Sequence, residues 1–431
     1  MTLYASTRDA SLAVGFSVAL MQGLAPDGGL FAPATLPRMA PQEFDGLESL
    51  AAVATRLLTP FVGTDPLTAA LPGLCAEAFN SPAPLQPLDA QGRLFVLELF
   101  HGPTAAFKDF GARFLAACFA GLRFADARAL TILVATSGDT GAAVASAFFE
   151  RPDVEVAVLF PKGLVSSTQE RQLTCWGSNV RSLAVRGTFD DCQRLVKAAF
   201  ADAELKRRTM MSSANSINLG RLLPQMSYFA AASLAVWRRY GEPASFVVPS
   251  GNLGNALACL LARAAGLPIG EVVLAHNANR TVPDYLETGA WRPRPSIATL
   301  ASAMDVGDPS NAERLRALYP DFSVLRGALS ACSVRDDEIR ARIRADYERY
   351  GQIWCPHTAT AAEAYQRLPA ARRAAHRWVI VSTAHPAKFP EVVAPLIGRA
   401  VPVPQSLAKL FARSGSCVEI APDLSALRAA L

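Results

Sequence analysis

The feature that most constrains this chain is the alternation, from Leu94 onward, of short apolar runs with longer amphipathic segments. Uninterrupted short apolar runs are typical of strands covered on both faces, whereas apolar residues three and four apart indicate a helix with one buried face. Strands alternating with helices in this way predict an open, twisted, mostly parallel α/β sheet with helices on both faces. The predicted strands are 94–97, 131–135, 154–160, 180–185, 246–248, 272–275 and 378–382. The predicted helices are 107–120, 140–149, 167–176, 189–200, 219–239, 255–265 and 336–350, the last of them charged and expected at the surface.

The length of 431 residues exceeds what one hydrophobic core ordinarily organises, so two or three domains are expected. Residues 1–92 are rich in Pro, Gly and Ala and show only modest helical periodicity, and we predict an N-terminal domain there. No low-complexity linker marks the other boundaries, so they follow the strand–helix rhythm. It predicts a large domain of 93–124 and 205–431, and a smaller α/β domain of 125–204 that is a candidate for movement.

Composition excludes several classes of protein. With 51% hydrophobic and 18% charged residues the chain is not disordered, and a net charge of +5 without a Lys/Arg-rich run gives no support to nucleic-acid or membrane-surface binding. No apolar run reaches the roughly 18 to 20 residues of a membrane span, and no signal peptide is visible at the start. The eight cysteines lie far apart without C-x-x-C spacing, which indicates reduced thiols and no metal site. We therefore expect a soluble, cytoplasmic protein.

The first segment able to support chemistry is 101–110, with the sequence HGPTAAFKDF. A Gly-Pro turn leads into a helix whose first turn holds Lys108 between Phe107 and Phe110. The helix dipole and desolvation by the two rings both lower the pKa of this amine, which favours a neutral nucleophile suited to Schiff-base formation. The alternative is that Lys108 extends from an amphipathic helix and pairs with a nearby acid, and the local sequence alone favours that structural role.

Two turns between a strand and a helix resemble anion sites. The segment 249–255 (PSGNLGN) has two glycines three residues apart, which allow the backbone to wrap a phosphate at a helix N-terminus. It lacks the third glycine of a dinucleotide fingerprint and the Gly-Lys-Ser/Thr of a Walker loop. The segment 135–141 (ATSGDTG) has the same placement, although a capped turn with Ser137 or Asp139 as the N-cap explains it equally well.

Two further segments contain cations. In 215–221, Asn218 and Arg221 are three residues apart and share a helix face, where the arginine could hold a second anion, although an Asn-capped helix with a surface arginine is the better local interpretation. In 382–389, the hydroxyl of Thr383 follows a strand at the carboxyl edge of the sheet, where ligands of open α/β sheets bind. Whether His385 and Lys388 are functional or structural is left open by the sequence.

Together, a lysine able to form an imine, a phosphate loop and a hydroxyl at a sheet edge are what a pyridoxal 5′-phosphate site requires. In their order along the chain and in their amino-acid sequence, these segments resemble the motifs of threonine synthases. The resemblance covers nearly the whole chain. The matching segments are 6–9, 23–31, 101–110, 136–141, 213–221, 250–255, 279–283, 303–306 and 383–389.

The resemblance implies the tryptophan-synthase-β fold, which is fold type II of the pyridoxal-phosphate enzymes, with an N-terminal extension and the cofactor in the large domain. It implies that Lys108 holds the cofactor as an internal aldimine and that Thr383 bonds to the pyridine nitrogen. Main-chain donors of one loop would hold the cofactor phosphate. These are Gly251, Asn252, Leu253, Gly254 and Asn255. Leu253 stands where Phe is common in the family and Asn255 where some members have Asp, but neither change removes a backbone donor.

The resemblance also assigns Ser137, Gly138, Asp139 and Thr140 to the substrate carboxylate. Many enzymes of the fold have Asn where this chain has Asp139, and a carboxylate there would be repelled by the cofactor's phenolate oxygen. The role of Asp139 is therefore left open.

The implied reaction is the last step of threonine biosynthesis, in which O-phospho-L-homoserine and water give L-threonine and phosphate by γ-elimination and addition of water at Cβ. Lys108 would remove the α-proton and later move protons at Cβ. For the substrate phosphate, Arg221 with Asn218 is the first candidate, followed by Lys162, Ser216 and Lys388.

Three other functions compete with this one. A phospholyase would use the same cofactor but release 2-oxobutyrate, and product analysis separates the two. A catalytically silent binding or scaffold protein is disfavoured because the lysine and the phosphate loop are both intact, and a dehydrogenase because no three-glycine fingerprint is present. The expected partner is the small-molecule substrate, without nucleic acid, membrane or an obligate protein partner.

Overall fold

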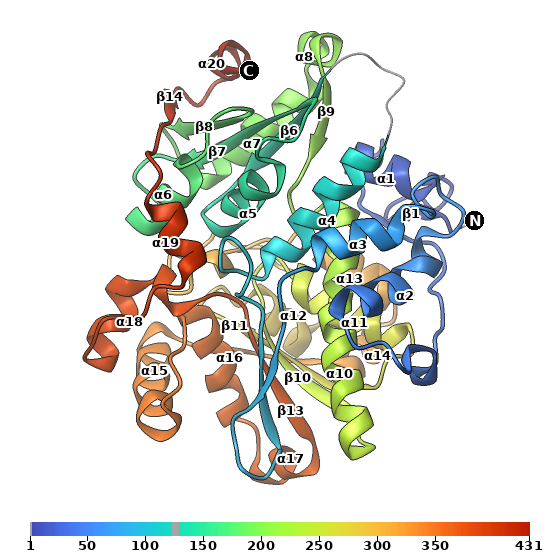
Figure 1. Cartoon of the computed structure of the whole chain (residues 1–431), viewed down its shortest axis with the longest axis vertical. Coiled ribbons are helices and arrows are strands. Elements are labelled where there is room, and N and C mark those ends of the chain that lie inside the picture. The colour runs from blue at the N-terminus through green and yellow to red at the C-terminus, as the bar shows by residue number, and fades with distance from the viewer. Residues whose placement is uncertain (1, 123–128) are drawn as a thin grey trace.

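The computed structural model describes residues 2–122 and 129–431, which form three sheets and the helices around them (Figure 1). A small antiparallel sheet near the N-terminus has the order β2-β1-β3, with β1 (Tyr4–Ser6), β2 (Ala13–Val14) and β3 (Phe31–Pro33). Three helices belong to the same N-terminal region: α1 (Phe16–Gln22), which lies between β2 and β3, and α2 (Leu50–Val62) and α3 (Leu71–Ala78), which follow β3. Their buried faces join the core that also contains α4 (Lys108–Gly121), so this region packs on the side of the molecule rather than standing apart.

The largest sheet has six strands in the order β12-β11-β10-β13-β5-β4, all parallel except the short edge strand β4. Its strands are β4 (Leu85–Pro87), β5 (Leu94–Glu98), β10 (Ala244–Pro249), β11 (Ile269–His276), β12 (Ser330–Ser333) and β13 (Arg377–Ser382). Alternate residues of the central strands enter two separate cores, because helices cover both faces. Helices α10 (Met226–Tyr240) and α11 (Gly254–Ala264) cover one face, and α16 (Pro356–Gln366) covers the other.

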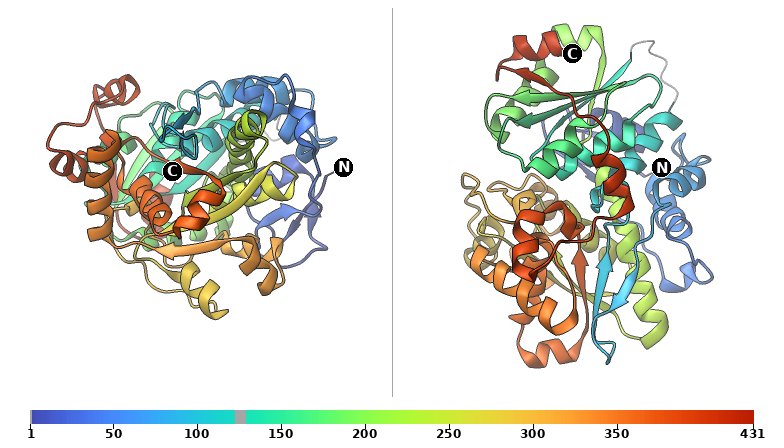
Figure 2. Two further views of the ribbon diagram at one scale, coloured as in Figure 1. Left: turned by 90° about the horizontal axis from the view of Figure 1, so that it is seen from below. Right: turned by 60° about the vertical axis from the view of Figure 1, so that its left-hand side comes forward.

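The second parallel sheet has the order β14-β8-β7-β6-β9. Its strands are β6 (Leu130–Ala135), β7 (Val154–Pro161), β8 (Val180–Val185), β9 (Met210–Ser213) and β14 (Val418–Ile420). Helices α5 (Asp139–Phe148) and α6 (Ser167–Thr174) pack on one face, and α7 (Phe189–Ala201) and α20 (Leu424–Ala430) on the other. In the right-hand view of Figure 2 the two parallel sheets lie in an upper and a lower lobe.

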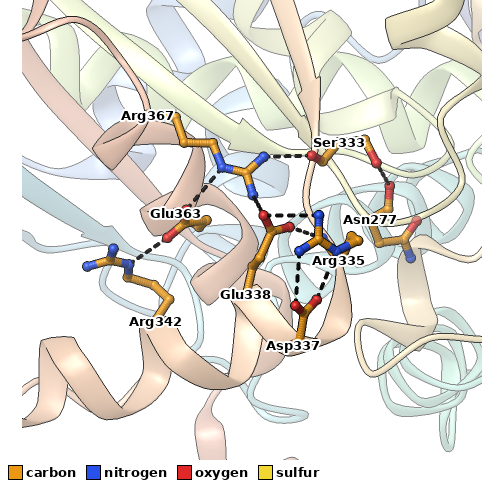
Figure 3. A network of polar contacts seen from close by, with 8 residues as sticks. All are labelled: Asn277, Ser333, Arg335, Asp337, Glu338, Arg342, Glu363 and Arg367. Carbon is orange, nitrogen blue, oxygen red and sulfur yellow. Dashed lines mark hydrogen bonds and ion pairs between the residues drawn. The ribbon is translucent and has the colours of Figure 1, made fainter.

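The remaining helices connect these layers. They are α8 (Ala203–Arg208), α9 (Leu219–Leu222), α12 (Thr281–Thr288), α13 (Ala312–Leu318), α14 (Phe322–Ala328), α15 (Asp336–Tyr350), α17 (Ala370–Ala375), α18 (Pro390–Ile397) and α19 (Gln405–Phe411). Helix α15 buries Ile339, Ile343 and Asp346 and exposes most of its charged face. Ion pairs that involve Arg342, Glu363 and their neighbours join α15 to α16 (Figure 3).

Every strand predicted from the apolar runs is present, and the helices differ at one point. The predicted helix 219–239 is broken into α9, a 3-10 turn at 223–225 and α10. Pro224 lies at this break, because proline has no amide proton and cannot continue an α-helical ladder.

Sheet membership differs from the predicted division of the chain at three places. β9 and β14 come from the segment assigned to the large domain but pair in the second sheet, and β4, from the predicted N-terminal domain, pairs with β5. Each of these strands has only three or four residues, too few for a periodic pattern. The predicted boundary between 124 and 125 lies outside the described residues. The domain limits therefore stay a prediction.

Over 2–122 and 129–431 no helix is long and apolar enough to cross a membrane. Within the same ranges no three His, Cys, Asp or Glu side chains are grouped as metal ligands.

Candidate active site

A cavity of about 340 Å³ lies where the carboxyl ends of strands from both parallel sheets meet. Segments that follow β6, β9, β10 and β13 line it, together with the first turn of α4 and part of α7. Ligands of open α/β sheets bind at this edge, because loops and helix N-termini converge there. Most segments singled out in the sequence therefore meet in one place.

Lys108 enters the cavity from the first residue of α4. Burial, together with the charges of Arg221 and Lys388, lowers the pKa of its amine to about 8, and the charge of Asp139 opposes this shift. The segment before it is fixed by Asp109, which accepts hydrogen bonds from the Thr104 amide at 2.9 Å and the Thr104 hydroxyl at 2.5 Å. Lys108 is thus held in place with an amine whose pKa lies within reach of neutral pH.

The loop 250–255 presents unused donors to the cavity. Among the described residues, no carbonyl or side chain accepts a hydrogen bond from the amides of 251–255. Leu253 adopts a left-handed conformation, with φ of 63°, and turns the chain into α11. The Asn252 side chain donates to the Ser216 hydroxyl at 2.7 Å and accepts from the Ser310 amide at 2.6 Å, which fixes the loop. The side-chain amide nitrogen of Asn255 is also buried without a partner there.

The loop 136–140 presents a second group of donors at the N-terminus of α5. The Thr136 hydroxyl accepts from the amides of Gly138 and Gly141 at 2.9 Å each, which shapes the turn. In the described part of the chain, the amides of Ser137, Asp139 and Thr140 have no acceptor. These donors and those of 251–255 line the same cavity as Lys108.

Asp139 and Lys388 form a buried ion pair, with 2.7 Å between Oδ1 and Nζ. Burial alone would raise the pKa of Asp139, but Lys388, Lys108 and His357 together hold it well below its usual range. Asp139 is therefore an ionised counter-ion of Lys388.

Thr383 lies at the end of β13, and its hydroxyl makes no hydrogen bond within the described residues. Its carbonyl accepts from the Phe107 amide at 2.9 Å, which places this hydroxyl beside the first turn of α4.

Arg221 also lines the cavity, although it is 2% exposed. Burial lowers the pKa of its guanidinium to about 10, against the attraction of Asp109, so it stays charged. One terminal nitrogen donates to the Ala214 carbonyl, while Nε has no partner among the described residues. Arg221 therefore keeps donors available, unlike the ordinary surface arginine of the alternative interpretation.

Three other predicted substrate residues are placed differently. The Asn218 side chain caps α9: its amide nitrogen donates to the carbonyls of Leu20 and Ser213, and its oxygen accepts from the Gly220 amide. Lys162 lies at the surface, paired with Glu419, and does not line the cavity. Lys388 does not line the cavity either. Ser216, the remaining candidate, does line the cavity as predicted for a substrate residue.

Several residues that line the cavity were not predicted from the sequence, Lys197 and His357 among them. Lys197 of α7 lines it but reads in the sequence as a solvated helix position. His357 was not singled out from the sequence, yet it lines the cavity with Nδ1 buried and unpartnered among the described residues. Its Nε2 accepts from the Ala303 amide at 3.0 Å, so the proton of the neutral ring is on Nδ1, and burial lowers its pKa to about 4. A Pro-His pair at a helix start carries no sequence signal for this placement.

These features fit pyridoxal phosphate. A lysine with a lowered pKa suits its aldehyde, the free amides at the start of α11 suit its phosphate, and a free hydroxyl suits its ring nitrogen. The fold and the site together define a pyridoxal-phosphate-dependent enzyme of the α/β type. A family model described as pyridoxal-phosphate dependent enzyme matches residues 77–384.

The comparisons with known proteins narrow this class. Models for the threonine synthase N terminus and the threonine synthase C-terminal region match residues 3–79 and 358–431. The chain is 40% identical to the threonine synthase of Haemophilus influenzae over 92% of this chain and 91% of that protein. It is 39% identical to that of Escherichia coli over 95% and 94%. The chain belongs to the threonine synthase family.

Solved structures agree with this assignment. The crystal structure of the Escherichia coli threonine synthase matches with a TM-score of 0.90 and 37% identity, over 100% of this chain and 99% of that one. The pyridoxal-phosphate-bound threonine synthase from Brucella melitensis matches with a TM-score of 0.90 and 35% identity, over 100% and 98%. A maize serine racemase, 17% identical with a TM-score of 0.52, shares the fold alone. The predicted family, fold class and cofactor are confirmed.

Proposed function

We propose that the chain converts O-phospho-L-homoserine and water to L-threonine and phosphate, with Lys108 as the residue that holds the cofactor and moves the protons. The observation that carries this proposal is the convergence of the Lys108 amine and two groups of unpartnered amides on one cavity. One group can bind the phosphate of the cofactor and the other the carboxylate of an amino acid. Bound there, pyridoxal phosphate supplies an electron sink that stabilises negative charge at the substrate carbons.

Lys108 acts as general base and acid. An amine with a pKa of about 8 is available in both protonation states near neutral pH, which suits a group that takes a proton at one carbon and delivers it at another. In this proposal its Nζ removes the substrate's Cα proton and later moves protons at Cβ. The two hydrogen bonds from Thr104 to Asp109 hold the segment that orients it.

The other cofactor contacts follow the two loops and the sheet edge. The amides of 251–255 hold the cofactor phosphate, assisted by the positive end of α11. Thr383 donates or accepts a hydrogen bond at the ring nitrogen, and a neutral hydroxyl does not force that nitrogen to stay protonated. The amides of Ser137, Asp139 and Thr140 hold the substrate carboxylate.

The substrate phosphate is assigned to Arg221, with Ser216 and Lys197 as neighbours. Arg221 is a buried cation with free donors that lines the cavity, which suits a dianion that must be bound and then released. Lys197 is exposed on α7 and supplies a second positive charge from the lobe that contains the second parallel sheet. Asn218, Lys162 and Lys388 are left out, because their polar atoms are used elsewhere or lie outside the cavity.

Product analysis tests the reaction. Purified protein with pyridoxal phosphate and O-phospho-L-homoserine is expected to release phosphate and L-threonine in equal amounts. Phosphate released together with 2-oxobutyrate would instead make the chain a phospholyase that uses the same site.

We further propose a cytoplasmic location and no obligate protein partner. All eight cysteines are free thiols and most are buried, which fits a reducing compartment. The partner of this chain in the reaction is a small-molecule substrate, as it is for other members of the threonine synthase family.

A further inference from the structure

We infer that Lys388 is a positioning residue, and that its ion pair with Asp139 fixes the amide loop 136–140 relative to the segment that holds Lys108. This inference rests on the proposed function, because it assigns both segments to one reaction. It gives Lys388 and Asp139 a role toward each other instead of a role toward the substrate phosphate or the cofactor.

The pair joins the two lobes. Asp139 is the first residue of α5, which follows β6 of the second sheet, whereas Lys388 follows β13 of the six-stranded sheet. The side chains are 5% and 0% exposed, and 2.7 Å separates Asp139 Oδ1 from Lys388 Nζ. A short buried ion pair across the two sheets holds their relative position more firmly than a solvated surface pair would.

A second contact of Lys388 extends the connection to Lys108. Its Nζ donates to the Thr104 carbonyl at 2.9 Å. The amide and hydroxyl of the same Thr104 donate to Asp109, the residue next to Lys108. One buried ammonium group therefore contacts both the loop proposed to bind the substrate carboxylate and the turn that orients the catalytic amine.

The charge balance explains why the lysine is needed. Asp139 lies in a cavity that is proposed to hold two phosphates and a carboxylate, and an uncompensated carboxylate there would repel all three. Lys388 neutralises it from behind, since Lys388 does not itself line the cavity. The same two charges act on Lys108 in opposite directions: Asp139 raises the pKa of the amine and Lys388 lowers it.

The test compares Lys388→Met, Asp139→Asn and the double variant. A variant with one partner leaves a buried unpaired charge, whereas the double variant restores neutrality. Lys409→Met, at an exposed position of α19, is the matched control for a lysine replaced by methionine. Three readouts are taken: thermal unfolding of the cofactor-free protein, kcat and KM for O-phospho-L-homoserine, and the pH midpoint of the cofactor–lysine absorption band.

Lys388→Met is expected to lower the unfolding temperature and to reduce kcat by about tenfold or more, with a smaller effect on KM. The absorption midpoint should move to higher pH in Lys388→Met and to lower pH in Asp139→Asn. The double variant should recover most of each loss, and it should fold even if Lys388→Met does not.

A double variant no better than Lys388→Met in folding, kcat and midpoint would overturn the inference. So would a Lys388→Met variant whose main change is a raised KM that Asp139→Asn does not correct, because Lys388 would then bind the substrate phosphate. The unfolding measurement uses no cofactor. A wild-type protein that binds no pyridoxal phosphate would therefore refute the proposed function, whereas failed rescue in an active enzyme would refute only this inference.

Discussion

Replacing Gly251 by alanine tests whether the loop 251–255 must keep its position to hold the cofactor phosphate. A Cβ at this residue would lie 2.7 Å from the Cα of Met304 and 3.3 Å from the carbonyl oxygen of Ala303. Ordinary contacts begin near 3.4 Å, so one of the two backbones must move by about 0.7 Å. Neither neighbour is the flexible end of a side chain.

The expected cost follows from this displacement. Overpacking of this kind costs about 1–3 kcal/mol, and the cofactor-free loop relieves it by moving away from Met304. Binding of the cofactor returns the amides to their original position, so the strain weakens binding by roughly 5- to 150-fold.

The assay is a titration of cofactor-free protein with pyridoxal phosphate, read from absorbance. Gly254→Ala is the matched comparison, because a Cβ there meets only Asn311 and Ser216 atoms at 3.7 Å. We expect Gly254→Ala to weaken binding by no more than about threefold. Equal affinities for Gly251→Ala and the wild type would refute the reasoning that this loop is held in a fixed position by Met304.

Two more predictions concern the site, and a third concerns a buried histidine. Arg221→Ala should raise KM for O-phospho-L-homoserine by at least about tenfold with a smaller change in kcat, as for a lost charge-assisted contact, and an unchanged KM would remove Arg221 as the phosphate ligand. Lys197→Met should raise KM by a few-fold in the same steady-state assay and Lys162→Met should not, so the reverse order would mean that the wrong lysine was chosen. Burial lowers the pKa of His276 to about 3, so the unfolded chain binds a proton that the folded chain does not, and stability should fall as the pH drops from about 6.5 toward 3. Urea unfolding between pH 4.5 and 7 should show that His276→Gln lacks this slope, which approaches about 1.4 kcal/mol per pH unit below about pH 6, and an unchanged slope would contradict the depressed pKa.

The strands and helices around the site could be predicted because each depends on a local pattern. Runs such as 246–248 are buried on both faces, and this burial explains why every residue in them is apolar. The short strands β9 and β14 could not be predicted, since their pairing depends on residues far away in the chain. Pro224 shows the opposite case: the apolar pattern predicted one helix over 219–239, although the proline alone indicates a break there.

The residues of the site also fall into those that the sequence could predict and those that it could not. Lys108, Thr383 and the loop 251–255 lie in segments whose amino-acid sequences closely resemble threonine synthase motifs. The structure brings these segments to one cavity. The partners of Lys388 and Asn218 could not be read from the sequence, because a buried side chain's hydrogen bonds depend on which distant backbone reaches it. Lys197 was missed for the related reason that a solvated helix face looks the same whether or not it borders a cavity.

The central claim is that Lys108 holds the cofactor. The most direct measurement is borohydride reduction of the protein with bound pyridoxal phosphate, which converts the imine to a stable amine, followed by peptide mass mapping. The account predicts a single peptide that carries the reduced cofactor and contains Lys108. The Lys108→Ala variant should yield no peptide with covalently bound cofactor. A modified peptide that contains Lys197 or another lysine instead, or a wild-type protein that takes up no label, would contradict it.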